Sequence, residues 1–190
     1  MGIMRDINPK TGPVGGVVAQ ISSCGGYQGV PGLAPYNASK FALEGFTEAV
    51  SKEVDPDWNI RFAIIEPGAV KTKWSSGNMD TSFRQHKAYV GKNLRTEVMR
   101  TIQEDLESKL AADADVVADL IAAVLRGESG TWDGKEVLRL PIGADSWAIV
   151  VSETLDQKKS FDQWRDISES TSTAEVKETL ITLGFLKNID

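Results

Sequence analysis

A strand–loop–helix unit between residues 15 and 53 constrains the fold of this chain more than any other feature. Residues 15–22, GGVVAQIS, form a short apolar run with β-branched side chains, which predicts a buried strand. A glycine-rich loop follows, and Pro35 suits the first turn of a helix because its missing N–H has no partner to lose there. Apolar residues then recur at helical spacing to about residue 53. This order predicts an α/β fold, in which ligands bind at the carboxyl ends of the strands.

Three polar side chains lie at this strand–helix junction. Tyr36 and Lys40 are four residues apart, so they share one face of the predicted helix. A nearby ammonium lowers the pKa of a phenol, ordinarily about 10, toward neutral pH. Ser23 ends the strand and could return across the loop to the same oxygen. A carbonyl held by the hydroxyl and protonated by the phenol is ready for a hydride, which must come from a cofactor.

A second predicted strand, residues 60–66, runs into the segment Pro67-Gly68-Ala69-Val70-Lys71-Thr72. Taken with the Ser-Ser end of the first strand and the Tyr-x-x-x-Lys spacing, this segment resembles the short-chain dehydrogenase/reductase family over roughly residues 12–150. The resemblance implies an oxidoreductase that uses NAD or NADP. It implies that Ser23, Tyr36 and Lys40 are catalytic, that Tyr36 and Lys40 also bind the cofactor, and that Pro67, Gly68, Val70 and Thr72 border its nicotinamide.

Residues 1–14 depart from the family pattern. The family begins with a strand and a Thr-Gly-x-x-x-Gly-x-Gly turn that places the pyrophosphate on a helix N-terminus. Nothing of that type precedes residue 12, and residues 8–13 predict a turn. We therefore expect the C-terminal part of a Rossmann-like doubly wound parallel sheet, about three parallel strands with flanking helices, with the N-terminal half missing. Such a chain would be marginal or oligomeric alone, because its first strand would be an open apolar edge.

We expect a partial NAD(P)-binding domain over residues 1–158, with a substrate lid at about 73–111, and a C-terminal extension over 159–190. Trp74 and Met79 in the lid, and Tyr27 and Gln28 in the loop after Ser23, are weak candidates for the substrate pocket; each is equally compatible with a surface role.

Beyond the lid, helical spacing and strand composition predict several elements. Helices are expected over 94–110, from Asp113 or Asp115 to Gly127, over 145–158 and over 174–183, with a third strand over 136–141. Phe161 and Trp164 are expected to dock back onto the chain. The buried face of the helix before Gly127 is expected to hold Val116, Val117, Leu120, Ile121, Val124 and Leu125.

Composition excludes several other functions. The chain of 190 residues has a net charge of −6 with no basic stripe, which argues against a nucleic-acid partner. No apolar run approaches the roughly 20 residues that span a bilayer, and the first residues are no secretory signal, so a cytoplasmic protein is expected. The single cysteine, Cys24, fits a reducing compartment, and one histidine with no spaced acidic set predicts no metal site.

Two functions of different class remain. The first is NAD(P)-dependent interconversion of an alcohol and a carbonyl, in a protein that is a homo-oligomer at full length. The alternative is a truncated, inactive fragment that at most associates with a full-length relative. A serine hydrolase is a weak third, because Ser23 lies in no Gly-x-Ser-x-Gly elbow and His86 would have to be the base.

Overall fold

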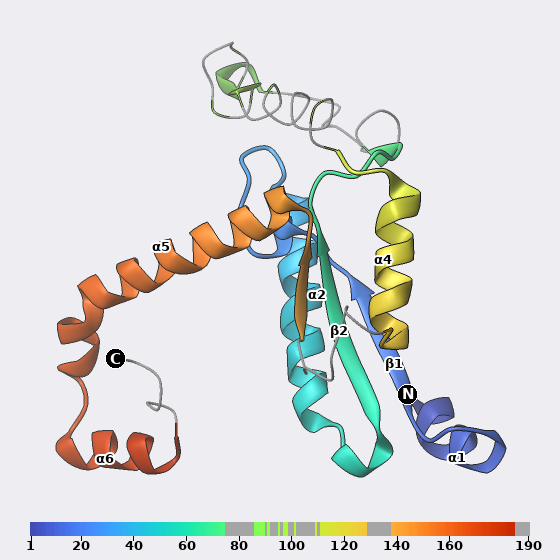
Figure 1. Cartoon of the computed structure of the whole chain (residues 1–190). Helices are drawn as coiled ribbons and strands as arrows, with labels where there is room; N and C mark the ends of the chain where they lie inside the picture. Colours follow the sequence, from blue (N-terminus) through green and yellow to red (C-terminus); the bar gives the residue numbers. More distant parts are fainter. Residues whose placement is uncertain are drawn as a thin grey trace. The chain divides into compact units, whose positions relative to one another are not determined.

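The structure is a computed structural model that describes residues 1–74, 86–89, 111–128 and 138–184, together with residues 91, 95, 97, 98, 101 and 109. The chain divides into two compact units, Met1–Val151 and Ser152–Asp190. The division falls seven residues before the expected domain boundary at 158. Figure 1 shows the elements of both units.

Three parallel strands form the sheet of the first unit, in the order β1-β2-β3. They are β1 (Gly16–Ile21), β2 (Ile60–Pro67) and β3 (Arg139–Ile142). In the register Val18 pairs with Phe62, and Ile65 pairs with Leu140. The predicted sheet of about three parallel strands is thus confirmed. The third strand begins three residues later than expected, and residues 136 and 137 lie outside the described residues.

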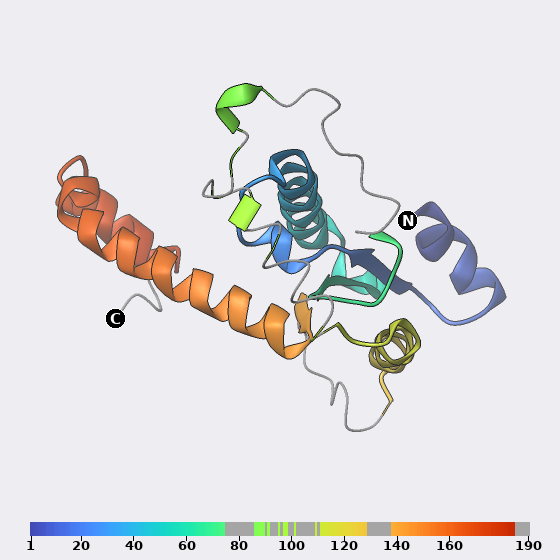
Figure 2. The ribbon, with the colours of Figure 1, turned by 90° about the horizontal axis from the view of Figure 1, so that it is seen from above.

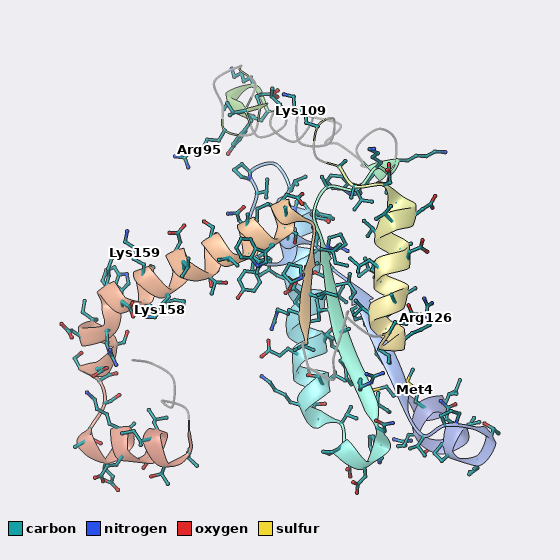
Figure 3. All side chains as sticks on the ribbon, in the orientation of Figure 1. Met4, Arg95, Lys109, Arg126, Lys158 and Lys159 are labelled. Atoms are coloured by element: carbon teal, nitrogen blue, oxygen red, sulfur yellow. The ribbon has the colours of Figure 1, made fainter. Side chains whose placement is uncertain are left out.

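The amino end of β1 is fixed by two neighbouring turns. Gly15 has a φ of +85°, and a Cβ there would lie 1.9 Å from the Asn59 carbonyl oxygen, so only glycine fits. The Gly16 N–H donates to the same carbonyl at 3.1 Å. Met4, labelled in Figure 3, packs its sulfur near Gly16 from the N-terminal helical segment.

That N-terminal segment is more helical than expected over residues 8–11. A π-helical turn, Ile3–Ile7, leads into α1 (Asn8–Thr11), where we expected a turn. The difference has a local cause, because Pro9 occupies the first turn of α1, the one place in a helix where proline costs no hydrogen bond. The described residues before Gly15 contain no strand, as predicted.

Helices α2 (Ala34–Glu53) and α4 (Ala114–Arg126) cover opposite faces of the sheet, as the view from above shows (Figure 2). Alternation along β2 sends Ala63 and Ile65 toward α4 and Ile64 and Glu66 toward α2. The core on the α4 side holds Ala63, Ile65, Val117 and Ile142, with Val70, Ala112, Ile121, Leu125 and Leu140 packed around it.

The predicted buried face of α4 includes residues that are exposed in the structure. Val117 and Val124 are buried, whereas Val116 is 65% and Leu120 is 41% exposed. The last two lie four residues apart on the outer side of the helix, where the sheet gives them no partner in the described structure. Asp113 stands at the N-cap position, but its carboxylate pairs with Lys71 at 2.8 Å instead of capping the helix.

The C-terminal elements are α5 (Ala144–Glu169) and α6 (Ala174–Thr182). Helix α5 runs eleven residues past its predicted end at Lys158, with i,i+4 ion pairs such as Lys158–Asp162 along it (Figure 3). Within the second unit Phe161 is 69% and Trp164 is 57% exposed, so neither is buried inside that unit, and their docking onto the first unit stays a prediction. Most of the helix expected at 94–110 lies outside the described residues. None of the described helices is long and apolar enough to cross a bilayer.

Candidate active site

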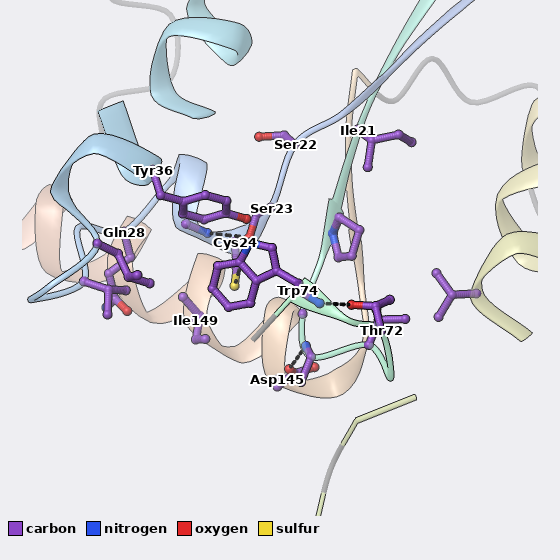
Figure 4. Close-up of a pocket in the computed structure, with 18 of the residues that line it drawn as sticks. Ile21, Ser22, Ser23, Cys24, Gln28, Tyr36, Thr72, Trp74, Asp145 and Ile149 are labelled. Atoms are coloured by element: carbon purple, nitrogen blue, oxygen red, sulfur yellow. Dashed lines mark hydrogen bonds between the residues drawn. The ribbon is translucent and has the colours of Figure 1, made fainter. Parts of the chain in front are cut away.

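A cavity of about 480 Å³ opens at the carboxyl ends of β1 and β2 in the first unit. Its walls come from the loop after β1, the first turn of α2, the loop after β2 and the starts of α4 and α5. Of the residues predicted from the sequence, Ser23, Gln28, Tyr36, Pro67, Gly68, Val70, Thr72 and Trp74 line it. The chain therefore brings most of the expected site to one place. Figure 4 shows the cavity.

Ser23 lies where the strand ends and a 3₁₀ turn, Cys24–Gly26, begins. Its backbone is extended, and its Oγ accepts a hydrogen bond from the Gly25 N–H at 3.1 Å. The Ser23 side chain also lies near the Tyr36 phenol and lowers its pKa. In Figure 4 the Tyr36 hydroxyl is directed toward Ser23. The two side chains thus approach each other across the loop, and their catalytic roles stay a prediction.

The Tyr36 phenol lies in a largely apolar environment. Its ring packs against the Trp74 indole with 5.3 Å between ring centroids (Figure 4). Burial raises the pKa of the phenol above its ordinary value, and the nearby Ser23 side chain opposes that shift. The phenol is therefore protonated at neutral pH in this structure.

The lowering of that pKa by Lys40 stays a prediction. The Lys40 ammonium donates a hydrogen bond to the Ile21 carbonyl oxygen at 2.9 Å and lies over the Tyr36 ring, 5.7 Å from the centroid. The cation thus faces the ring and the strand end, and the residues lining the cavity do not include Lys40.

Asn37 is a site residue that the sequence analysis missed. Its side chain, 5% exposed, donates to the Gly25 carbonyl at 2.7 Å and the Gln28 carbonyl at 3.1 Å, and accepts from the Val30 N–H at 3.0 Å. It therefore fixes the loop between Ser23 and Tyr36. A polar residue directly after Pro35-Tyr36 gave no signal, because asparagine is ordinary on a helix surface.

Asp145 is the second missed residue. Its Oδ2 accepts a hydrogen bond from the Ala69 N–H at 2.7 Å, which holds the Pro67–Thr72 segment at the cavity. A Cβ on Gly68 would lie 2.2 Å from the same carboxylate, so the close approach requires glycine. Both partners belong to patterns visible in the sequence, but their contact joins positions 76 residues apart.

The remaining candidate site residues lie in different places relative to the cavity. Gln28 and Trp74 line the cavity, Tyr27 is half-buried outside the lining, and Met79 lies outside the described residues. The exposed His86 ring packs near Tyr89, with 6.4 Å between centroids. Burial raises the pKa of the Cys24 thiol, which disfavours the thiolate. The described residues contain no group of three or more potential metal ligands.

Comparison with known proteins finds several that are similar in sequence. Residues 3–82 match the short chain dehydrogenase family. The oxidoreductase calM of Penicillium decumbens is 33% identical over 155 residues, covering 81% of this chain and 49% of that protein. An uncharacterized oxidoreductase of Schizosaccharomyces pombe is 32% identical over 161 residues, covering 85% and 51%.

Solved structures are similar to the chain as well. A short-chain dehydrogenase from Streptomyces avermitilis superposes with a TM-score of 0.64 at 27% identity, covering 83% of this chain and 53% of that one. The chain belongs to the short-chain dehydrogenase/reductase family. It spans about half the length of the curated relatives it matches.

Proposed function

We propose that this short-chain dehydrogenase/reductase chain carries the reacting half of an NAD(P)-dependent oxidoreductase that interconverts an alcohol and a carbonyl. The observation that carries the proposal is the approach of the Ser23 side chain to the protonated Tyr36 phenol in one cavity with Pro67–Thr72. A positioned phenol can exchange a proton with a substrate oxygen, and a neighbouring hydroxyl can orient that oxygen.

The residues around the cavity fit the nicotinamide end of the cofactor. The close contact of Gly68 with Asp145 leaves the Pro67–Thr72 backbone at the cavity wall, where Pro67, Gly68, Val70 and Thr72 would border the ring. A bound NADH or NADPH supplies the hydride for reduction, and the oxidised form accepts it in the reverse direction. The described residues offer no comparable cradle for the pyrophosphate or the adenine.

The protein's own groups divide the remaining work. The Ser23 hydroxyl would donate a hydrogen bond to the substrate oxygen and orient it. Tyr36 would give its proton to that oxygen in reduction and take it back in oxidation. Lys40, one helical turn away, would stabilise the phenolate that this transfer leaves and would hold the nicotinamide ribose. The cavity lining is mainly apolar, which favours the exclusion of water from the reacting atoms.

The alternative is an inactive fragment that associates with a full-length relative. It is favoured by the outer side of α2, where Phe41 is 45% and Phe46 is 62% exposed. Homo-oligomerisation of the longer protein through this helix would cover the same side chains. Co-expression with a full-length relative and co-purification tests the association.

The function is tested by supplying the upstream half. The chain is joined to the N-terminal half of a relative such as the Schizosaccharomyces pombe oxidoreductase, and NADH or NADPH oxidation is followed with a panel of ketones. We expect turnover with at least one carbonyl substrate. A folded, cofactor-binding fusion that transfers no hydride to any of them favours the inactive fragment instead.

A further inference from the structure

The side of the sheet covered by α2 holds a charged layer that the proposed reaction does not use. At its centre is Glu66, which is 0% exposed. Neither carboxyl oxygen of Glu66 has a hydrogen-bond partner among the described residues. The nearest cation is Arg139, whose Nε lies 3.8 Å from Glu66 Oε1. A carboxylate in this position has lost its water without gaining hydrogen bonds, which is strongly unfavourable.

Glu44, on the inner side of α2, links this layer to the active site. Its Oε1 accepts a hydrogen bond from the Ser22 hydroxyl at 2.7 Å, and its Oε2 accepts one from Arg139 Nε at 3.3 Å. A Cβ on Gly26 would lie 2.2 Å from Glu44 Oε1. Glu44 therefore contacts the residue before Ser23 and the turn after it.

The charges of the layer do not balance if every carboxyl is ionised. The charged groups that reach it are Glu44 and Glu48 from α2, Glu66 from β2 and Arg139 from β3; β1 contributes the Ser22 hydroxyl, and the Ser146 hydroxyl of α5 binds the Glu66 carbonyl. Lys52 and Arg139 hold the pKa of Glu48 at about 2, so this rim group is ionised. One guanidinium then faces both buried carboxyls.

We propose that Glu66 is a positioning residue that carries a proton in the folded chain, leaving Arg139 to Glu44, which holds the segment from Ser22 to Gly26 in place. The catalytic meaning of this inference rests on the proposed function, because Ser23 lies in that segment; the proton on Glu66 does not. Burial, followed by the neighbouring Glu44 carboxylate, raises the pKa of Glu66 to about 7, against the lowering effect of Arg139.

The proton makes stability depend on pH in a defined window. The Glu66 pKa is raised from its ordinary 4.5 to about 7, so between these values the folded chain binds one proton more than the unfolded chain. The contribution of Glu66 to stability is therefore complete below pH 4.5, falls as the pH rises through about 7, and stays constant above that value. When Glu66 ionises, the buried carboxylates of Glu44 and Glu66 share the single guanidinium of Arg139. This charge change lies next to the segment that holds Ser23.

Thermal unfolding of the 190-residue chain and its Glu66→Gln variant between pH 5 and 9 tests the proposal. Glutamine keeps the size of glutamate and stays neutral. We expect similar melting temperatures at pH 5 and a melting temperature on the order of 5 °C higher for the variant at pH 8. Glu48→Gln is the matched control, because it removes an ionised carboxylate from the same Arg139 and adds no pH dependence in this window. Parallel curves for wild type and Glu66→Gln overturn the proposal.

Infrared spectroscopy gives a readout that does not depend on a stable variant. The difference spectrum of the wild-type chain between pH 5.5 and pH 8.5 should contain the carbonyl stretch of one buried protonated carboxyl, and its absence also overturns the proposal. In the fusion enzyme, kcat of the wild type should fall with rising pH as Glu66 ionises. The Glu66→Gln variant should not show this fall. A fusion without hydride transfer but with the melting difference refutes the proposed function alone.

Discussion

The two faces of the sheet are built from different chemistry. On the α4 side, Ala63 and Ile65 pack against Val117 and Ile142 in an apolar core. On the α2 side, Ile64 is accompanied by buried polar residues, among them Thr47, Glu44 and Glu66. The same β2 strand therefore supports the fold through one set of alternate residues and the candidate site through the other.

The two faces therefore rely on different kinds of interaction. The α4 face gains free energy from apolar burial, which has no directional requirement. The α2 face positions Ser23, Tyr36 and the segment after β2 with hydrogen bonds and ion pairs, which are directional and contribute little net stability. Substitutions on the two faces should accordingly separate stability from activity.

The largest expected effect is on the α2 side and concerns activity. Tyr36→Phe in the fusion enzyme should lower kcat by about 10²- to 10⁴-fold, because the proton donor is lost. The unfolding free energy should change by about 1 kcal/mol or less, since the ring stays in place and only its hydroxyl near Ser23 is removed. Steady-state kinetics and urea unfolding measure the two quantities. Full activity of the variant refutes the acid–base role of Tyr36.

The next largest effect is on the α4 side and concerns stability. Ile65→Ala should lower the unfolding free energy by about 2–5 kcal/mol, because a fully buried side chain leaves a cavity. The loss should be equal at pH 5.5 and pH 8, since the α4 face holds no titrating group in the described core. Val116→Ala, at a position 65% exposed, serves as the control and should stay within about 0.5 kcal/mol.

The sequence predicted the sheet because its strands and helices carry strong local signals. The β-branched run before Ser22, Pro35 at the start of α2 and the Pro67-Gly68 segment each indicate an element and the place where it ends. The position of Tyr36 beside Ser23 followed from those signals. Helix spacing alone could not tell that Val116 points outward, because the sheet that defines the buried side comes from distant residues.

The missed residues share one physical reason. Asn37 and Asp145 act through hydrogen bonds to backbone groups of other segments, and a side-chain-to-backbone contact leaves no pattern at its partner. The burial of Glu66 could not be predicted from the sequence either. An acidic residue at the end of a strand suggests exposure, and only the fold buries it completely on the side of the sheet that α2 covers.

A third prediction concerns the loop held by Asn37. Asn37→Ala should lower the unfolding free energy by about 1–3 kcal/mol, because two carbonyls and one N–H of the loop lose their buried partner. In the fusion enzyme kcat should fall as well, since the loop sets the distance between Ser23 and Tyr36. Ser39→Ala, which removes an exposed hydroxyl bonded within α2, is the control. A variant with wild-type stability and kcat contradicts the positioning role.

The smallest net effect is expected for Glu44→Gln. The substitution removes a partner of Arg139 but also the carboxylate that raises the pKa of Glu66, so the unfolding free energy at pH 7 should change by only about 1 kcal/mol. The pH dependence should change more, because the fall in stability between pH 4.5 and 7 becomes shallower. Urea unfolding at several pH values measures both. An unchanged slope would mean that Glu44 does not influence Glu66.

The most direct test of the central claim, that this chain builds the nicotinamide end of the site, is a fluorescence titration. The 190-residue chain is titrated in parallel with reduced nicotinamide mononucleotide and with NADH, and Gly68→Val serves as the variant that disturbs the contact with Asp145. We predict saturable binding of both compounds with Kd values on the order of 1 mM and within about threefold of each other, lost in the variant. No saturable binding to a folded chain, or NADH bound about a hundredfold more tightly than the mononucleotide, would contradict the account.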